Sequence, residues 1–344
     1  MRVLVAGGAG YIGSHMVQAL LATGHEPVVF DNLATGHRAA VAPSVTLVEG
    51  DLLDRDALRE CFATHAPDAV MHFSARSLVA ESMADPALYY ANNVSGTLNL
   101  LQEMCATGVD RFVFSSTAAV FGEPDTVPIR DDAPPRPINP YGISKWMVER
   151  ILADFDRAYG LRSVSLRYFN AAGASLGGTI GEDHRPETHL IPLVLQTALG
   201  KRRSISVFGT DYPTEDGTCI RDYIHVQDLC SAHLLALDHL AAGGESRTYN
   251  LGNGRGFSVR AVINAAQQVT GGIIPVEAAA RRPGDPAVLV ADSSRIRADL
   301  GWKPAYPELE TIVDHAWQWH RTHPDGFDFV APAATEGPRV RPPT

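Results

Sequence analysis

Tyr141 and Lys145 stand four residues apart in the segment Tyr-Gly-Ile-Ser-Lys. On a helix this spacing places both side chains on one face, so the lysine ammonium lies beside the groups that contact the phenol. A phenol titrates near ~10 in water, and a neighbouring cation favours its ionised form. The pair therefore predicts a tyrosine that takes up and returns a proton near neutral pH. Taken alone, the same spacing is more often found on an ordinary amphipathic surface helix.

A glycine-rich turn near the start of the chain gives the pair a context. An apolar run ending at Ala6 leads into Gly7, Gly10 and Gly13, after which apolar residues recur at helical spacing. Glycines at such a junction let the backbone approach a pyrophosphate, whose charge the free amides and the helix dipole stabilise. The spacing departs from the G-x-G-x-x-G of many dehydrogenases. Together with the tyrosine and lysine, the turn predicts a nucleotide cofactor.

Acidic residues follow the next two expected strands. Asp31 comes after the apolar segment 27–30, about where a carboxylate meets the adenosine ribose hydroxyls. A carboxylate there repels a 2′-phosphate, which favours NAD over NADP. Asp51 comes after 45–48 and is placed to meet the adenine. Both residues could instead be ordinary turn residues.

Short apolar segments continue to alternate with helical ones, with strands expected at 69–73, 111–114 and 163–168. This rhythm predicts an α/β protein with a Rossmann-type doubly wound parallel sheet and its ligand at the carboxyl ends of the strands. The polar run Ser115-Ser116-Thr117 ends one of these strands, and we expect all three side chains to face the cleft.

The rhythm breaks down after Ala171 into glycine- and proline-rich stretches typical of a substrate-binding lobe. Arg221 and Arg282 offer planar donors suited to a diphosphate. Each arginine alone is more often a surface or domain-bridging residue. Beside a nucleotide cleft, they favour a second phosphate site.

Composition excludes several classes of partner. A formal net charge of -10 argues against a nucleic-acid surface, which needs clustered basic residues. No apolar run approaches a membrane span and no signal-like segment precedes the first strand, so we expect a cytoplasmic protein with no membrane partner. The four cysteines show no metal-type pairing and the histidines no close ligand cluster, so we expect no metal.

The block 221–226, Arg-Asp-Tyr-Ile-His-Val, completes a set of motifs together with the glycine turn, Asp31-Asn32-Leu33, Ser115–Thr117 and the Tyr141/Lys145 pair. With these in order, the chain resembles the extended short-chain dehydrogenase/reductase family over about 2–302. Within that family it is most similar to the enzymes that interconvert UDP-galactose and UDP-glucose. Those enzymes keep NAD bound and invert C4 of the sugar through a transient 4-keto sugar.

The resemblance implies roles for single residues. Tyr141 would take the proton from the 4′-hydroxyl, Lys145 would hold the nicotinamide ribose and lower the tyrosine pKa, and Thr117 would hydrogen-bond the same sugar oxygen. The implied NAD contacts are Gly7, Gly10, Tyr11, Ile12, Gly13, Asp31, Asn32, Asp51, Leu52, Phe73, Asn92, Lys145 and Tyr168. The implied UDP-sugar contacts are Thr117, Tyr141, Asn170, His189, Leu190, Phe208, Arg221, Arg282, Asp285 and Leu289.

The chain departs from the family pattern at a few positions. Ser77 stands where some members have a lysine on a cofactor phosphate, and His189 where some have asparagine beside the nucleotide. Leu289 aligns with the position where a bulky tyrosine excludes N-acetyl sugars and smaller residues admit them. We therefore expect weak turnover of UDP-N-acetylglucosamine.

Other functions share this scaffold. Family 4,6-dehydratases carry Asp-Glu after the threonine, whereas this chain has Ala118-Ala119. Epimerases of UDP-glucuronate or UDP-pentoses share the catalytic trio and differ in the pocket. A non-catalytic NAD-binding sensor is a further alternative, which the intact trio speaks against.

The resemblance also implies a division of the chain. We expect residues 1–169, with a returning segment at about 222–240, to form the NAD-binding Rossmann domain. Residues 170–221 and 241–325 would form a smaller mixed α/β domain for the nucleotide sugar, and 331–344 a disordered tail. Apolar stripes on helices near 92–107 and 141–158 are mostly explained by core packing. Their exposed remainder would suit a symmetric contact, so we expect a homodimer through these helices.

Overall fold

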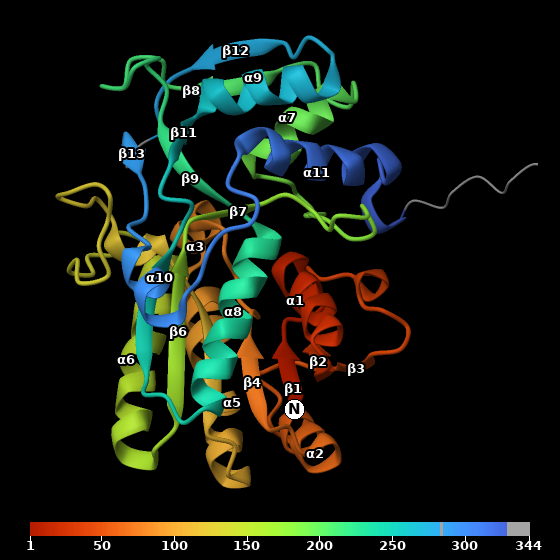
Figure 1. Cartoon of the computed structure of the whole chain (residues 1–344), viewed down its shortest axis with the longest axis vertical. Helices are drawn as coiled ribbons and strands as arrows, with labels where there is room; N and C mark the ends of the chain where they lie inside the picture. Colours follow the sequence, from red (N-terminus) through yellow and green to blue (C-terminus); the bar gives the residue numbers. More distant parts are fainter. Residues whose placement is uncertain (283–284, 329–344) are drawn as a thin grey trace, which may run out of the picture.

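The structure is a computed structural model that describes residues 1–282 and 285–328. The tail expected at 331–344 lies outside the described residues. A seven-stranded sheet, with every pairing parallel, forms the lower part of the molecule in Figure 1, in the order β10-β6-β5-β4-β1-β2-β3. Its strands are β1 (Arg2–Ala6), β2 (Glu26–Asp31), β3 (Thr46–Glu49), β4 (Ala69–His72), β5 (Arg111–Thr117), β6 (Arg162–Tyr168) and β10 (Arg247–Leu251).

Helices cover both faces of this sheet, which is why its central strands are apolar along their whole length. Val3, Leu4 and Val5 of β1 are completely buried, and alternate residues join two different cores. One core lies under α1 (Tyr11–Ala22), α8 (Val226–Ala241) and α10 (Ser294–Leu300). The other lies under α2 (Arg55–His65), α5 (Gly96–Thr107) and α6 (Pro140–Tyr159). The predicted Rossmann-type doubly wound sheet is thereby confirmed.

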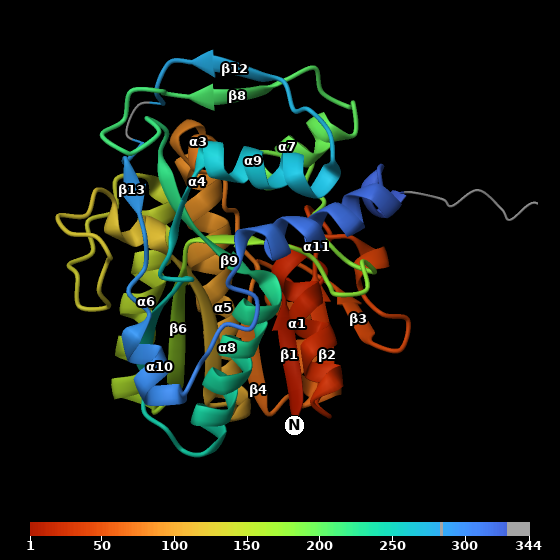
Figure 2. The same ribbon diagram turned by 45° about the horizontal axis from the view of Figure 1, so that its top comes forward.

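A second lobe lies above the carboxyl ends of the sheet (Figures 1 and 2). Its strands are β7 (Asn170–Ala172), β9 (Ile220–His225), β11 (Gly256–Ser258) and β13 (Val288–Leu289) in one sheet, and β8 (Ile205–Phe208) with β12 (Val276–Ala279) in another. The helices α7 (Leu190–Ala198), α9 (Val259–Thr270) and α11 (Leu309–Thr322) pack into a third core. The expected mixed α/β lobe is present.

One strand of the main sheet falls where the sequence division places the second lobe. The expected range 241–325 contains β10, which pairs with β6 from Arg247↔Val164 to Leu251↔Tyr168. The helix α10, in the same range, packs against β10 and α8. The sheet domain therefore takes in more of the chain than the segments 1–169 and 222–240.

Shorter elements connect these parts. The helices α3 (Val79–Ala84) and α4 (Pro86–Tyr89) lead through a π-helical turn, Tyr90–Ser95, into α5, and a 3-10 turn, Ala118–Phe121, follows β5. Within the described residues, no helix is long and apolar enough to cross a membrane. The cysteines are free thiols, and Cys61, Cys219 and Cys230 are buried.

Candidate active site

The glycine turn joins β1 to α1, and its glycines have different reasons to lack a side chain. Gly7 adopts φ +80°, and a Cβ there would collide with the backbone of Ser74. A Cβ on Gly13 would collide with the carbonyl of Gly7. On Gly10 it would meet only the Gly7 carbonyl, at 3.5 Å, so the chain itself leaves room there. Gly10 is also the N-cap of α1 and has no side chain to bond the helix. The first amides of the helix are therefore left to bind an anion.

Three of the predicted adenosine contacts lie together beyond this turn. The Asp31 carboxylate accepts hydrogen bonds from the backbone amides of Ala9, at 2.9 Å, and Leu33, at 2.8 Å, so it also fixes the turn. Burial raises the pKa of Asp31. Asn32 donates to the Asp51 carboxylate at 2.8 Å. The free first amides of α1, the room beside Gly10 and the Asp31 carboxylate together fit a dinucleotide whose ribose has both hydroxyls free.

The proposed catalytic residues meet where α6 begins beside the end of β5. Asn139 caps α6 through the Gly142 amide at 2.8 Å, and Pro140 begins the helix. Lys145, only 4% exposed, donates from Nζ to the Ser115 carbonyl at 2.9 Å. Thr117 is the last residue of β5 and is 7% exposed. The structure thus brings Thr117, Tyr141 and Lys145 to one end of the sheet.

Burial dominates the titration of these groups. It raises the pKa of Tyr141, and a hydrogen bond with Thr117 offsets only part of that rise. The expected lowering of the Tyr141 pKa by Lys145 is therefore wrong for the chain by itself. Burial lowers the pKa of Lys145 to about 7, although the Glu149 carboxylate opposes the change. The lysine ammonium bonds a carbonyl of β5 instead of acting directly on the phenol.

The remaining predicted cofactor residues line the same end of the sheet. Tyr168 is the last residue of β6, and its hydroxyl shares a hydrogen bond with the Ser115 side chain. Phe73 follows β4, bonds the Ala6 carbonyl at 2.7 Å and packs on the His233 ring of α8. The others are Tyr11 and Ile12 in the first turn of α1, Leu52 after β3, and Asn92 in the π-helical turn.

The expectation that Ser115, Ser116 and Thr117 all face the cleft is wrong. Side chains alternate along a strand, and the hydroxyl of Ser115 lies 3.3 Å from His233 of α8. The hydroxyl of Ser116 points the other way, to Glu149 of α6, at 2.5 Å. Both serines fasten β5 to its covering helices.

Most of the predicted nucleotide-sugar contacts lie in the second lobe. The Arg282 guanidinium lies over the Phe208 ring, 4.0 Å from its centroid. Arg221 of β9 forms an ion pair with Asp285. Leu289 of β13 pairs in register with Arg221 and packs on Val120, Phe121 and Ile129. Val120 and Phe121 follow Thr117 closely, so Leu289 links the predicted nucleotide-sugar contacts to the sheet domain. Asn170 begins β7, opposite Tyr223 of β9.

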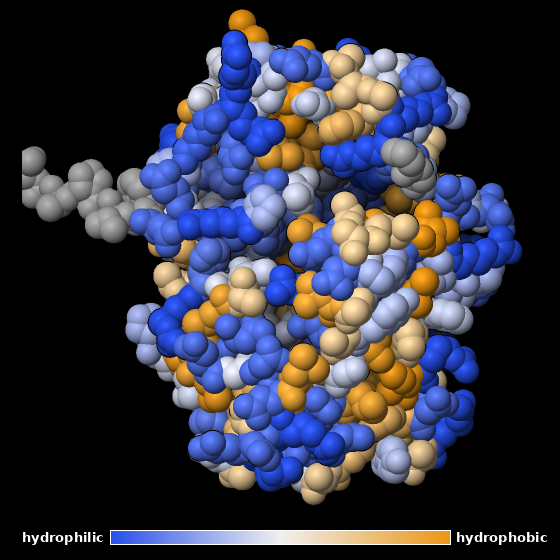
Figure 3. Space-filling view, turned by 180° about the vertical axis from the view of Figure 1, so that it is seen from behind, coloured by the Kyte–Doolittle hydropathy of each residue, from blue (hydrophilic) through white to orange (hydrophobic). Residues whose placement is uncertain are grey.

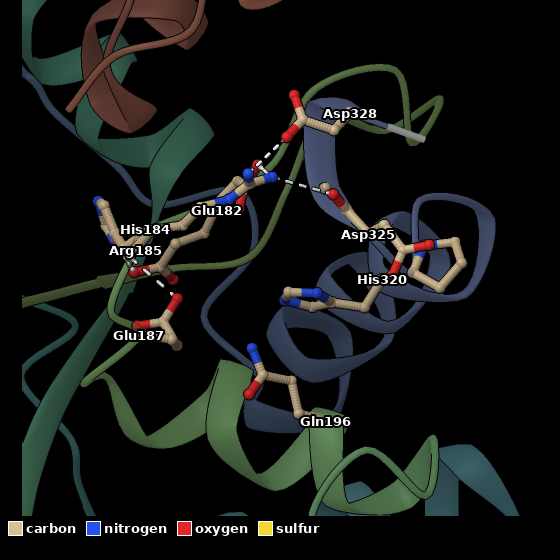
Figure 4. A pocket seen from close by; sticks show the side chains of 11 residues that line it. Glu182, His184, Arg185, Glu187, Gln196, His320, Asp325 and Asp328 are labelled. Atoms are coloured by element: carbon tan, nitrogen blue, oxygen red, sulfur yellow. Dashed lines mark hydrogen bonds and ion pairs between the residues drawn. The ribbon is translucent and has the colours of Figure 1, made fainter. Parts of the chain in front are cut away.

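His189 is the N-cap of α7 and Leu190 is the first residue of that helix. His189 belongs to a cluster of charged groups, of which Figure 4 shows Glu182, His184 and Glu187. Glu182, 4% exposed, contacts both His184, at 3.2 Å, and His189. Glu187 lies 3.8 Å from His184 and 3.9 Å from His189. The ligand atoms of these four residues lie within 4.8 Å of one another, so the expectation that the histidines form no close cluster is wrong.

Attraction between the two glutamates and the two histidines of the cluster explains why these four side chains lie together. A buried carboxylate needs opposite charges, and the two imidazoles supply them. Glu182 and Glu187 raise the pKa of His184 to about 10 against the effect of burial. His189 Nδ1 and Glu182 are already in direct hydrogen-bond contact. Glu182, His184 and Glu187 of the cluster line an open polar pocket of about 360 Å³ between the 182–187 segment, α7 and the end of α11.

Sequence reasoning missed Glu149 and Arg167 beneath the catalytic residues. Their side chains form an ion pair at 2.6 Å and are only 7% and 8% exposed. The signal for Glu149 was its place four residues after Lys145, which continues the helical face of Tyr141 and Lys145. The Glu-x-His-x-x-Glu-x-His run at 182–189 was the corresponding signal for the charged cluster.

Comparisons with known proteins agree with this geometry. Residues 3–252 match the profile of the NAD dependent epimerase/dehydratase family. A UDP-glucose 4-epimerase from Halalkalibacterium halodurans is 55% identical over 327 residues, 95% of this chain and 98% of that protein. The crystal structure of UDP-glucose 4-epimerase from Brucella ovis in complex with NAD superposes with a TM-score of 0.90 at 49% identity, over 92% of this chain and 97% of that one.

The UDP-Glc/GlcNAc 4-epimerase of Campylobacter jejuni superposes with a TM-score of 0.82 at 45% identity, over 93% of this chain and 99% of that one. The matches span both lobes, so they cover the glycine turn, the end of β5 and the second-lobe contacts alike. The chain belongs to the NAD dependent epimerase/dehydratase family.

Proposed function

We propose that this protein interconverts UDP-galactose and UDP-glucose by inverting C4 of the sugar, through a 4-keto sugar that stays bound. The observation that carries the proposal is the convergence of Thr117, Tyr141 and Lys145 at the end of a sheet whose glycine turn fits a dinucleotide. Relatives at 55% and 49% identity that are UDP-glucose 4-epimerases support the choice of substrate.

The proton is handled by side chains of this chain. Tyr141, in its ionised form, would take the proton from O4 of the sugar and, after the 4-keto sugar has turned, give the proton back to O4. Thr117, whose side chain interacts with that hydroxyl, holds the same sugar oxygen in place. Lys145 and the glycine turn would hold NAD, which when bound would supply the hydride acceptor at C4 and a positively charged ring that favours the ionised phenol.

The second lobe holds the nucleotide while the sugar turns. Arg221 and Arg282 supply planar donors for the diphosphate, and Phe208 offers an apolar ring for the uracil. Asn170, Leu190 and His189 contribute around the nucleotide. The sheet domain holds NAD, so the two ligands meet between the lobes.

Incubation of the purified protein with UDP-galactose, without added NAD, tests the proposal. We expect UDP-glucose to form until the two sugars reach a constant ratio, as followed by chromatography. Tyr141→Phe is the control for a contaminating activity. If no UDP-glucose forms even with NAD supplied, the proposal fails, and UDP-glucuronate and UDP-pentoses become the next substrates to assay.

A second substrate class has support at Leu289. Its side chain, smaller than tyrosine, packs beside the residues that follow Thr117. The Campylobacter jejuni relative is described as acting on both UDP-Glc and GlcNAc forms. We therefore include weak turnover of UDP-N-acetylglucosamine in the proposal. The same chromatographic assay with that sugar checks it.

We also propose a homodimer through α5 and α6. Met147 of α6 is 39% exposed, and Ile151 and Phe155 are only partly covered by the core beneath them. Figure 3 shows apolar side chains gathered on the back of the molecule, on the side where α5 and α6 lie. Analytical ultracentrifugation should give twice the monomer mass, and Met147→Glu should halve it. Ile273→Glu, at an 88% exposed residue of the second lobe, is the matched control.

A further inference from the structure

The face of α6 that carries Tyr141 and Lys145 continues to a third polar side chain, Glu149, one turn further on. The Glu149 side chain is only 7% exposed. A carboxylate that deep in a protein is costly unless opposite charges and hydrogen bonds compensate it. The proposed proton transfer does not use Glu149, so its burial calls for another explanation.

Two strands hold the Glu149 carboxylate. Arg167 of β6 donates from Nε to Oε1 at 2.9 Å and from Nη2 to Oε2 at 2.6 Å. Ser116 of β5 donates its hydroxyl to Oε1 at 2.5 Å. Arg167 also lies over the Phe121 ring, 5.1 Å from its centroid, just after β5. The carboxylate therefore ties α6 to the ends of β5 and β6.

Ser116 is the residue between the two groups of β5 that serve the site. The Ser115 carbonyl accepts the hydrogen bond of Lys145, and the Thr117 side chain interacts with Tyr141. We propose that Glu149 is a positioning residue that fixes this end of β5 against Lys145 and Tyr141 of α6. The inference rests on the proposed epimerase function, and it adds a residue that does not contact the substrate.

The groups around Lys145 make Glu149 its negative neighbour. His72 of β4 and His233 of α8 are buried, and burial lowers their pKa values to about 3 and about 4, so both are neutral near pH 7. Burial raises the pKa of three tyrosines, so they are neutral as well: Tyr89 of α4, Tyr141 of α6 and Tyr168 of β6. The Arg167 guanidinium lies beyond Glu149 and pairs with it.

This arrangement has a consequence for protonation. Burial already lowers the pKa of Lys145 to about 7, and the Glu149 charge opposes a further fall. Without that charge the ammonium loses its proton at lower pH. Because the proposed role of Lys145, holding the nicotinamide ribose, needs the ammonium form, activity should then decline at lower pH than in the wild type.

Glu149→Gln tests the proposal, because it keeps the shape of the side chain and removes the charge. We expect kcat for UDP-galactose to fall roughly 10- to 100-fold, with KM within about 3-fold of the wild type. The alkaline limb of the kcat–pH profile should move down by about one pH unit or more. Glu60→Gln, at an exposed glutamate of α2, is the matched control.

Two further variants separate positioning from mere stability. Ser116→Ala removes one hydrogen bond to Glu149 and leaves the Glu149 charge paired with Arg167. We expect a kcat loss of about 3- to 10-fold at unchanged KM. Glu149→Gln with Arg167→Met removes the whole ion pair, which should restore thermal stability lost in the single variant. It should not restore the alkaline limb.

The outcomes are distinct from those of the function assay. A wild type that produces no UDP-glucose overturns the epimerase function and with it this inference. An active wild type whose kcat and alkaline limb survive Glu149→Gln overturns the inference alone. So does a double variant in which stability and the pH profile recover together, because Glu149 would then act only through the fold.

Discussion

The proposed catalytic residues and the proposed nucleotide-sugar contacts are built differently. Thr117 and Lys145 are 7% and 4% exposed and belong to a long strand and a long helix. Arg221 and Asp285, whose side chains are 13% and 26% exposed, come from β9 and from a loop, and Arg282 is exposed.

This difference matches what each region has to do. A proton transfer needs its groups held to within a fraction of an ångström, which buried hydrogen bonds between regular elements achieve. A sugar that must present both faces needs a firm hold on the nucleotide and room around the ring. Substitutions in the two regions should therefore affect different kinetic constants.

The largest effect is expected at Tyr141. Tyr141→Phe keeps the ring in its buried site and removes only the proton-transferring hydroxyl, so kcat should fall by about 10³-fold. KM for UDP-galactose and the amount of NAD that copurifies should change little. Tyr159→Phe, at a residue 66% exposed, is the matched control. A Tyr141→Phe enzyme with more than about a tenth of wild-type kcat would contradict the assignment.

Arg221 should show the opposite split between kcat and KM. Arg221→Met removes the diphosphate donors and leaves Asp285 without its partner, so KM for UDP-galactose should rise by roughly 10- to 100-fold. We expect kcat to stay within about 3-fold, because the reacting groups lie in the other region. Arg255→Met, which breaks an exposed pair with Glu308, should change neither constant. A loss confined to kcat would erase the distinction between the regions.

Leu289 lies between the two regions and should alter substrate choice. Leu289→Tyr fills space beside Phe121, so turnover of UDP-N-acetylglucosamine should fall by about 10-fold or more. Turnover of UDP-galactose should change by less than about 2-fold. Leu289→Met, of similar volume, is the control. Equal losses on both sugars would mean that Leu289 supports packing instead of sugar selection.

The smallest effect concerns stability of the second region at alkaline pH. Because the folded pKa of His184 is raised to about 10, the cluster stabilises the fold fully below the unfolded value near ~6.5 and less as pH rises toward 10. Since the side chain is about one third exposed, we expect His184→Gln to cost about 1 kcal/mol at pH 6 and near ~0 at pH 10. Urea unfolding at both values measures the difference. A cost that does not change with pH would argue for packing alone.

Sequence patterns were sufficient where one force decides local structure. The strands predicted from the apolar runs at 27–30 and 69–73 agree with β2 and β4 to within a residue or two at each end. Strands buried on both faces of a sheet need such continuous apolar runs. The glycine turn was predictable because steric limits at Gly7 and Gly13 leave few alternatives. The meeting of Tyr141 and Lys145 with Thr117 followed from helical spacing and from the rule that strand ends share one edge.

Other features depend on long-range contacts that no local pattern reveals. The strand β10, Arg-Thr-Tyr-Asn-Leu, lies at a sheet edge and mixes polar with apolar residues, so no continuous apolar run marks it in the sequence. Whether Ser116 faces the cleft or α6 depends on the exact register of β5. The cluster at 182–189 depends on an irregular loop conformation, so its histidines and glutamates could not be placed together beforehand.

The late position of β10 in the chain has a consequence for synthesis on the ribosome. Until residue 241 has emerged, the face covered by α8 is bare, and until residue 251 has emerged, β6 has no partner along one side. Unpaired strand edges and exposed apolar faces are the features through which nascent chains aggregate. A fragment ending near residue 169 would keep both faults, so the sheet domain cannot be excised as one contiguous piece. Completion of that sheet must await the synthesis of Leu251, the last residue of β10.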